Sequence, residues 1–369
     1  MLKSFASTLE TGFELVERKV TLRSEIINGI IQFFSCCYCL AVVPEQLATA
    51  GYDKVATVTC VCVSCGLGCI FASYVTNLPF IIAPPTAVSI YLTTCIKQQG
   101  LNQKDAATAV VLSGIALLVI GTVKPLGRLV VRLIPESIQA ATAVGIGLVT
   151  ALAGAVEIGL VVRGKFTLLT TGDLDAGIVI TILAIVLSGV ALTYQWRGAL
   201  VYGMVCGTFL WWIWENDWPT ALVAQPYIVH ERIHLLEADR SVVMLSLNLF
   251  FLSLMTLNGL VRQFADLAGL TTGEGVVPRG SWVLIVCGLM TIISGMLCGP
   301  PILISPESAS GIKSGAVTGL STLVCGLLFL LSLYLAPLFA SIPSSGTSPL
   351  LILVGMLLFQ VSIIPIIPI

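Results

Sequence analysis

The 369-residue chain has little charge and almost no histidine. Only 10% of its residues are charged and 57% are hydrophobic, and its mean hydropathy is +1.01. Soluble domains carry roughly 25% charged residues, so this composition excludes a water-soluble globular protein and indicates a chain that crosses a lipid bilayer many times. The net charge of −1 points to no polyanionic partner, and no nucleic acid is expected.

The scarcity of histidine bears on the 12 cysteines, which lie almost wholly within apolar runs. Cys36, Cys37 and Cys39 are spaced closely enough to suggest a metal cluster. Both histidines fall outside the apolar runs, however, so none is available there to complete a ligand set. We therefore interpret the cysteines as small apolar residues that pack within a membrane, and we expect neither a metal nor an organic cofactor.

What the chain does have is long apolar runs, about twelve of which can cross or half-cross a bilayer. No signal-peptide pattern precedes the first of them. Residues 1–25 are polar and amphipathic and contain four basic side chains, Lys3, Arg18, Lys19 and Arg23. The positive-inside rule places this end in the cytoplasm. We expect an integral membrane protein, in the plasma membrane, with a cytoplasmic N-terminus.

The most informative stretch is residues 299–319, GPPILISPESASGIKSGAVTG, between two long apolar runs. Pro300 and Pro301 rule out a normal helix on the N-terminal side. Residues 302–304 are short, branched and apolar, which favours an extended segment. Irregular backbone at membrane depth survives only where protein or a water-filled cavity surrounds it. The stretch therefore predicts an interrupted tenth crossing.

A new helix is predicted after this interruption, with Ser305 as its N-cap, Pro306 at its first position and Glu307 in its first turn. A broken crossing whose new helix points its N-terminus at the membrane centre is a common binding-site arrangement in secondary transporters. Glu307 is the principal candidate for function, since ionisable groups inside a membrane are expensive and are usually retained for a purpose. The alternative is a structural capping acid.

The third crossing is interrupted in a similar way by Pro84 and Pro85, and in each case a serine follows the double proline by four residues, Ser89 here and Ser305 there. Seven crossings separate the two interruptions, and an odd number inverts the second copy. The pattern predicts an all-α polytopic inverted-repeat transporter of the 7+7 type, with short extended segments in spans 3 and 10. Because only about twelve spans are counted, we expect either that the chain is a fragment or that its second repeat is incomplete.

Several motifs carry a family resemblance over nearly the whole chain. The most specific block is Glu307-Ser-Ala with Gly311-Ile and Thr318-Gly-Leu, and weaker matches are Arg23-Ser-Glu-Ile-Ile-Asn-Gly29 and Asn77-Leu-Pro-Phe80. With these motifs the chain resembles the AzgA-like purine permeases of the nucleobase–cation symporter group, in the xanthine/uracil permease superfamily. The resemblance implies proton-coupled uptake of adenine, guanine or hypoxanthine by alternating access, without enzymatic activity.

The resemblance also implies two domains that move against each other. Residues 26–133 (spans 1–4) and 241–340 (spans 8–11) would form a core, and residues 134–214 (spans 5–7) and 341–369 a gate whose second part is incomplete. Residues 1–25 would be a cytoplasmic segment and residues 215–240 an extracytoplasmic loop. A homodimer through the gate domains is a further implication.

By the same resemblance, Glu307 corresponds to the span-ten glutamate that holds the purine, and Ser89 lies where the family usually has an asparagine. In span eight the family usually carries two aspartates, where this chain has Leu249 and Leu252 with Asn248 and Ser253 as nearby polar substitutes. The predicted substrate-binding residues are Glu307, Ser89, Asn248, Ser308 and Pro85. Glu307 and Glu157 are the candidates for proton coupling.

Each of the other candidates has a structural alternative. Ser89 either hydrogen-bonds a ring nitrogen or bonds back to its own backbone, and Asn248 either contacts the base or bridges helices. Asn77 either holds the broken backbone or caps the end of a loop. Glu157 is either a proton carrier on the gate side or a span-end residue that reaches toward the headgroups.

His230-Glu-Arg-Ile-His234 is a separate motif that matches HExxH. On a helix its histidines could bind zinc, with Glu231 as general base. The segment follows a tryptophan cluster and lies in the longest polar loop, and no supporting signature accompanies it. The alternatives to purine transport are therefore a same-fold carrier of another small solute, a degenerate member that transports nothing, and a zinc membrane protease.

Overall fold

The computed structural model of the chain describes residues 10–123, 136–164, 169–194, 196, 199–216, 218–219, 223, 225–227, 239–270, 277 and 279–363. Helices dominate these residues. The helices are α2 (Leu22–Cys36), α3 (Cys39–Ala48), α4 (Lys54–Thr76), α5 (Thr86–Gln99), α6 (Gln103–Thr122), α8 (Glu136–Glu157), α9 (Ala176–Thr193), α10 (Ala199–Glu215), α11 (Arg240–Leu267), α12 (Gly280–Met296), α13 (Ser308–Lys313), α14 (Gly319–Leu331), α15 (Ala336–Ala340) and α16 (Ser344–Ile363), with a 3₁₀ turn η1 at Ser332–Leu335.

Six helical segments are long and apolar enough to cross a membrane by length and composition: Leu22–Ala48, Lys54–Thr76, Gln103–Thr122, Ala176–Thr193, Arg240–Leu267 and Gly319–Ala340. Three shorter apolar helices accompany them, Gly147–Glu157, Gly280–Met296 and Ser344–Met356. The chain is thus built as an integral membrane protein. The predicted count of about twelve spans and the 7+7 repeat stay predictions.

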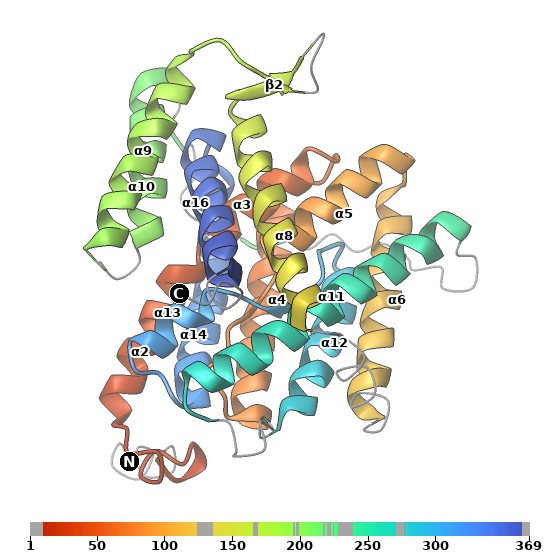
Figure 1. Cartoon of the computed structure of the whole chain (residues 1–369), viewed down its shortest axis with the longest axis vertical. Coiled ribbons are helices and arrows are strands. Elements are labelled where there is room, and N and C mark those ends of the chain that lie inside the picture. The colour runs from red at the N-terminus through yellow and green to blue at the C-terminus, as the bar shows by residue number, and fades with distance from the viewer. Residues whose placement is uncertain are drawn as a thin grey trace.

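The helices gather in two groups (Figure 1). In one group α8, α9, α10 and α16 pack on one another, and in the other α12 packs on α6 and α4, and α14 on α4 and α2. Helix α14 approaches α4 so closely that a Cβ added at Gly319 would lie 2.4 Å from the carbonyl oxygen of Ser73. The predicted core and gate boundaries, residues 26–133, 134–214, 215–240, 241–340 and 341–369, stay predictions.

The two broken crossings meet inside the second group. Strand β1 (Ile82–Ala83) pairs antiparallel with β4 (Leu303–Ile304), with Ile82 opposite Ile304 and Ala83 opposite Leu303. All four residues are buried. Proline cannot donate a backbone hydrogen bond, so the double prolines that flank this pair keep it short. The predicted extended segments in spans 3 and 10 are confirmed.

The main apolar core surrounds this strand pair and includes most of the cysteines. None of the 12 cysteines is in a disulfide within the described residues, and every one except Cys206 is buried. In the described part of the chain, no group of three His, Cys, Asp or Glu side chains is arranged to hold a metal ion. Most of the cysteines pack in the apolar core between helices, and the absence of a metal or cofactor stays a prediction.

Two local predictions were wrong. Helix α13 begins at Ser308 rather than at Pro306, with Glu307 in the N-cap position, because the Ser308 amide bonds the carbonyl oxygen of Ser305 in a tight turn at 3.1 Å. The fold is also not wholly helical outside the broken crossings, since an exposed hairpin of β2 (Val161–Arg163) and β3 (Leu169–Thr171) follows α8. Each strand of this hairpin has only three residues, too few to show the alternating pattern from which a strand is predicted.

Candidate functional site at the paired broken crossings

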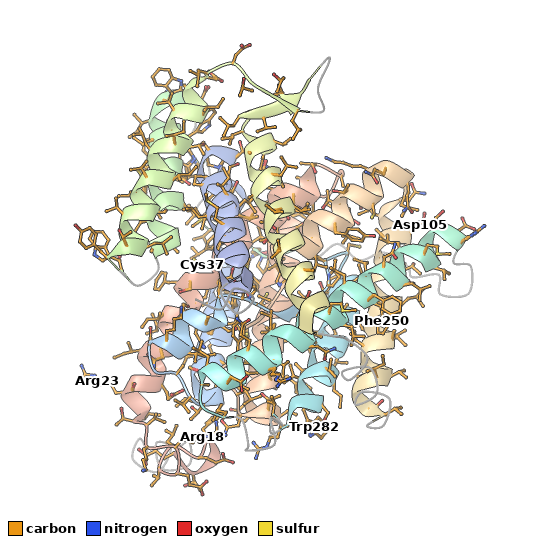
Figure 2. All side chains as sticks on the ribbon, in the orientation of Figure 1. Arg18, Arg23, Cys37, Asp105, Phe250 and Trp282 are labelled. Carbon is orange, nitrogen blue, oxygen red and sulfur yellow. The ribbon has the colours of Figure 1, made fainter. Side chains whose placement is uncertain are left out.

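Glu307 lies in the turn between β4 and α13, half-buried. The hydroxyl of Tyr38 donates a hydrogen bond to its Oε1, and the hydroxyl of Ser305 donates one to its Oε2. The Sγ of Cys36 lies 3.5 Å from the Ser305 hydroxyl. The carboxylate is thus held between the break after α2 and the turn after β4. Figure 2 shows the neighbouring Cys37 about halfway along the long axis of the molecule, on the left of the view.

Ser305 does not act as the predicted N-cap. Its hydroxyl donates to the Glu307 carboxylate instead of accepting from a backbone amide of α13, and the described residues provide no other side-chain cap for this helix. A charged carboxylate forms a stronger hydrogen bond than a neutral acceptor does. The hydroxyl therefore orients Glu307 rather than starting the helix.

Ser308 connects the two broken crossings. Its hydroxyl accepts a hydrogen bond from the Ile81 amide at 2.9 Å and donates one to the carbonyl oxygen of Ser305 at 2.7 Å. The residue is fully buried. These contacts hold β1 against the turn that presents Glu307, and the predicted contact of Ser308 with a substrate stays a prediction.

Ser89 bonds back to its own helix. Its buried hydroxyl donates to the carbonyl oxygen of Pro85 at 3.2 Å. Pro85 is the residue that precedes α5, and its carbonyl oxygen also accepts from the Ser89 and Val88 amides. The contact is the back-bond that the sequence left as the alternative, and a role for Ser89 or Pro85 in substrate binding stays a prediction.

Helix α11 packs against α5, β4 and α13. Asn248 is exposed on it and interacts with the hydroxyl of Tyr91 on α5, a contact that bridges helices. Leu249 is fully buried in the main core and Leu252 packs against it. Ser253 is fully buried, and its hydroxyl has no hydrogen-bond partner among the described residues. Leu249 and Leu252, which the resemblance placed at two positions usually acidic, are thus packing residues.

Glu157 ends α8 in different surroundings. Its carboxylate faces Glu45, Lys54 and the hydroxyls of Thr347 and Ser348, and Lys54 forms an ion pair with Glu45. Glu307 contacts none of these side chains in the described structure; its hydrogen bonds go to Tyr38 and Ser305. Glu157 and Glu307 are therefore held by separate groups of residues.

A buried polar cluster joins the N-terminal segment to both broken crossings. Asn77 has a left-handed backbone (φ 50°) and caps α4, and its side-chain oxygen accepts from the Gly319 amide at 2.8 Å. Arg18 donates to the carbonyl oxygens of Asn77 at 2.9 Å and Val317 at 2.7 Å. Asn77 therefore fills both structural roles considered for it, the cap and the support of broken backbone.

Glu25 completes this cluster from α2. It is fully buried and accepts hydrogen bonds from the Val317 amide at 3.0 Å, the Thr318 amide at 3.3 Å and the Thr318 hydroxyl at 2.8 Å. Nearby, Phe13 and Leu15 are buried against Leu320. Figure 2 shows Arg18 and Trp282 at the same end of the molecule. Residues 13–18 are therefore packed into the folded structure.

Residues 23–363 match the model of the family Xan_ur_permease, which is described as a permease family. The chain belongs to this family. The matched residues include both broken crossings, Glu307, Asn77 and Glu25, but not Arg18.

Named relatives of this permease agree with the family assignment. The adenine permease AdeP of Escherichia coli is 28% identical over 356 residues, covering 95% of this chain and 80% of AdeP. The guanine/hypoxanthine permease GhxP of Escherichia coli O157:H7 is 27% identical over 366 residues, covering 96% and 81% of the two chains. The family and these relatives are described as permeases, which are transporters, and this points away from an enzyme.

The fold of the permease resembles that of a solved transporter. The transmembrane domain of the cyanobacterial bicarbonate transporter BicA superposes with a TM-score of 0.72 at 15% identity, over 92% of this chain and 89% of that one. At this low identity the likeness concerns the fold alone. His230, Glu231 and His234 of the zinc-protease alternative lie outside the described residues, and the permease relatives do not favour that alternative.

Sequence reasoning missed two residues of the permease site, both on the first crossing. Tyr38 contacts Glu307 from the break between α2 and α3, and no periodicity in the apolar run indicates that break. Gln32 is fully buried, and its Nε2 donates to the carbonyl oxygen of Pro79 at 2.9 Å, while its Oε1 has no partner within the described structure. A lone glutamine inside an apolar run was the available signal for Gln32.

Proposed function

We propose that this permease carries purine nucleobases, namely adenine, guanine or hypoxanthine, and that Glu307 binds the base. The observation that carries the proposal is the position of Glu307 at the turn beside the paired strands β1 and β4, with its side chain half-buried. The names of the adenine and guanine/hypoxanthine permeases among its relatives support this substrate class.

The chemistry of the carboxylate suits a purine. An ionised carboxylate accepts hydrogen bonds from the N–H groups of the base, and a protonated one can donate. An acid at the centre of a membrane helix costs about 2.5–3.5 kcal/mol. The hydrogen bonds from Tyr38 and Ser305 offset part of this cost. Ser89, Asn248, Ser308 and Pro85 are proposed to complete the site.

Transport would proceed by proton symport with alternating access, as the core moves against the gate of the inverted repeat. Glu307 and Glu157 are the proposed proton carriers, since the span-eight positions hold Leu249 and Leu252. The proposal includes a plasma-membrane location, a cytoplasmic N-terminus and a homodimer through the gate domains.

The decisive experiment is uptake of radiolabelled hypoxanthine, adenine and guanine in cells that lack purine uptake. Wild type is compared with Glu307→Gln and with Glu17→Gln, a matched control on the exposed N-terminal segment. We expect Glu307→Gln to lower uptake at least about tenfold, which corresponds to about 1.4 kcal/mol, and the control to match wild type. A wild-type protein that reaches the membrane and takes up none of the three purines would overturn the proposed function.

Proton coupling has its own test in the same cells. Uptake is measured with and without a protonophore, in wild type and in Glu157→Gln. We expect the protonophore to abolish accumulation by wild type, and Glu157→Gln to retain exchange of base for base while losing accumulation. Accumulation that is insensitive to the protonophore would contradict symport and leave base binding by Glu307 intact.

A further inference from the structure

Tyr38 joins two parts of the molecule that the proposed transport cycle must couple. It lies in the break between α2 and α3, with only 2% of its surface exposed. Its hydroxyl donates to Oε1 of Glu307. Tyr38 therefore connects the candidate binding carboxylate to the buried interior of the protein.

The ring of Tyr38 belongs to an apolar cluster that we call the seam. The seam joins residues from the first crossing and α5 to residues near α10 and α16, and its buried members are Tyr38, Ala41, Val42, Ile90, Met204, Ile342, Leu350, Leu351 and Val354. Helices α10 and α16 belong to the other helix group. A movement of the Tyr38 ring would displace its neighbours in the seam, since close-packed side chains transmit small shifts.

The two donors to Glu307 differ in origin. Ser305 is two residues from Glu307 in sequence and lies in the same turn, so it moves with the carboxylate. Tyr38 is 269 residues away and comes from a different crossing. Only the Tyr38 hydrogen bond can therefore be exchanged without rebuilding the turn.

The hydroxyl of Tyr38 occupies an acceptor position that suits a purine. The N–H groups of the base are hydrogen-bond donors, as is the neutral phenol hydroxyl. Oε2 already accepts from Ser305, which leaves Oε1 as the oxygen that Tyr38 and the base would share. The base therefore competes with Tyr38 for the same acceptor when it docks on the carboxylate.

We propose that Tyr38 is a positioning residue that holds Glu307 while the site is empty, and that the purine displaces its hydroxyl from Oε1. The displaced ring then shifts its neighbours in the seam, so that binding of the purine changes the packing at α10 and α16. This inference rests on the proposed function and adds an internal competitor for the substrate.

The competition makes a prediction of definite sign. Tyr38→Phe keeps the ring and removes the hydroxyl, so the base no longer has to displace a hydrogen bond. We expect the Kd for hypoxanthine to fall about tenfold, since a hydrogen bond to a charged group is worth about 1.5–3 kcal/mol. We also expect the maximal transport rate to fall, because binding no longer moves the ring.

The test uses the purified full-length protein in lipid nanodiscs. Equilibrium binding of labelled hypoxanthine is measured for wild type, Tyr38→Phe and Tyr334→Phe, a control whose tyrosine is 55% exposed. The proposal is supported if Tyr38→Phe binds hypoxanthine more tightly in the nanodiscs and takes it up more slowly in the cells that lack purine uptake. Unchanged or weaker binding overturns it, because a tyrosine that contacts the base directly would weaken binding when its hydroxyl is removed.

A second measurement uses wild type in case Tyr38→Phe does not fold. Difference infrared spectra of protein with ring-labelled tyrosine are recorded with and without hypoxanthine. We expect a shift of a tyrosine C–O band as one hydroxyl leaves a carboxylate, and binding without any tyrosine shift would overturn the inference. Failure of wild type to bind any purine is a different result, which would contradict the proposed function itself.

Discussion

The side-chain oxygen of Asn77 accepts a hydrogen bond from the amide of Gly319, 2.8 Å away and 242 residues further along the chain. The Nδ2 of the same side chain donates to the carbonyl oxygen of Phe13 at 3.2 Å. One buried amide thus ties the end of α4 to the start of α14 and to the N-terminal segment. The broken crossings depend on such contacts because their own backbone hydrogen bonding is interrupted.

Asn77→Ala is expected to lower the free energy of unfolding by about 2–4 kcal/mol. Alanine is strained in the left-handed conformation, and the Gly319 amide loses its acceptor in a buried setting. The measurement is the thermal midpoint of the detergent-solubilised protein. Asn77→Gly relieves the strain without restoring the hydrogen bonds, so its thermal midpoint should lie between those of Asn77→Ala and wild type. A midpoint for Asn77→Ala equal to that of wild type would show that this contact does not stabilise the fold.

Ser308→Ala and Ser89→Ala are expected to differ in stability. The first leaves the Ile81 amide without its acceptor and should cost about 1–3 kcal/mol. The second removes only a back-bond within α5, and alanine is a better helix former, so the thermal midpoint should hardly change. If Ser89 also binds the base, Ser89→Ala lowers uptake at an unchanged midpoint. Equal destabilisation by both substitutions would contradict the role assigned to Ser308.

Glu25→Gln is expected to destabilise the protein by about 2–4 kcal/mol, since hydrogen bonds to charged groups are worth about 1.5–3 kcal/mol each. Glutamine has one acceptor oxygen where glutamate has two, and its NH2 group is a donor. In the variant this NH2 group therefore faces a backbone amide donor of Val317 or Thr318. Unfolding is followed in detergent, with Glu17→Gln as the exposed control. A variant as stable as wild type would show that the hydrogen bonds to the Glu25 carboxylate do not stabilise the fold.

The N-terminal segment is expected to become less stable in acid. The hydrogen bond from Arg18 lowers the pKa of Glu14 from its ordinary value of 4.5, partial burial opposes this, and the charges of Arg18 and Arg279 lower it further. A lowered pKa means that the carboxylate stabilises the folded state above about pH 4.5 and that this contribution is lost as the pH falls through the folded-state value. Arg279 lies 3.3 Å from Glu14 and Arg18 2.9 Å from it.

The check is the pH dependence of the thermal midpoint in wild type and Glu14→Gln. Wild type should lose more stability than the variant between about pH 6 and pH 3. The difference should also shrink at high salt, because exposed ion pairs are screened. Parallel curves for the two proteins would contradict a stabilising role for this carboxylate.

Much of the site was predictable because its signals are local in sequence. Double prolines interrupt helices wherever they occur, so the interruptions in spans 3 and 10, with Glu307 beside the second, could be inferred without coordinates. The exact helix start could not, since it depended on whether the Ser305 hydroxyl met a backbone amide or the Glu307 carboxylate. The separate partners of Glu157 and the bridging contact of Asn248 depend likewise on helix packing.

By itself, the sequence determined that this protein lies in a membrane, since too few of its side chains are charged for water, and that two crossings are interrupted. Only the tertiary structure decided that β1 meets β4, that Tyr38 holds Glu307 and that Asn77 reaches Gly319. The physical reason is distance along the chain. Proline and charge act on their immediate neighbours, whereas these hydrogen bonds join segments more than two hundred residues apart that only packing brings together.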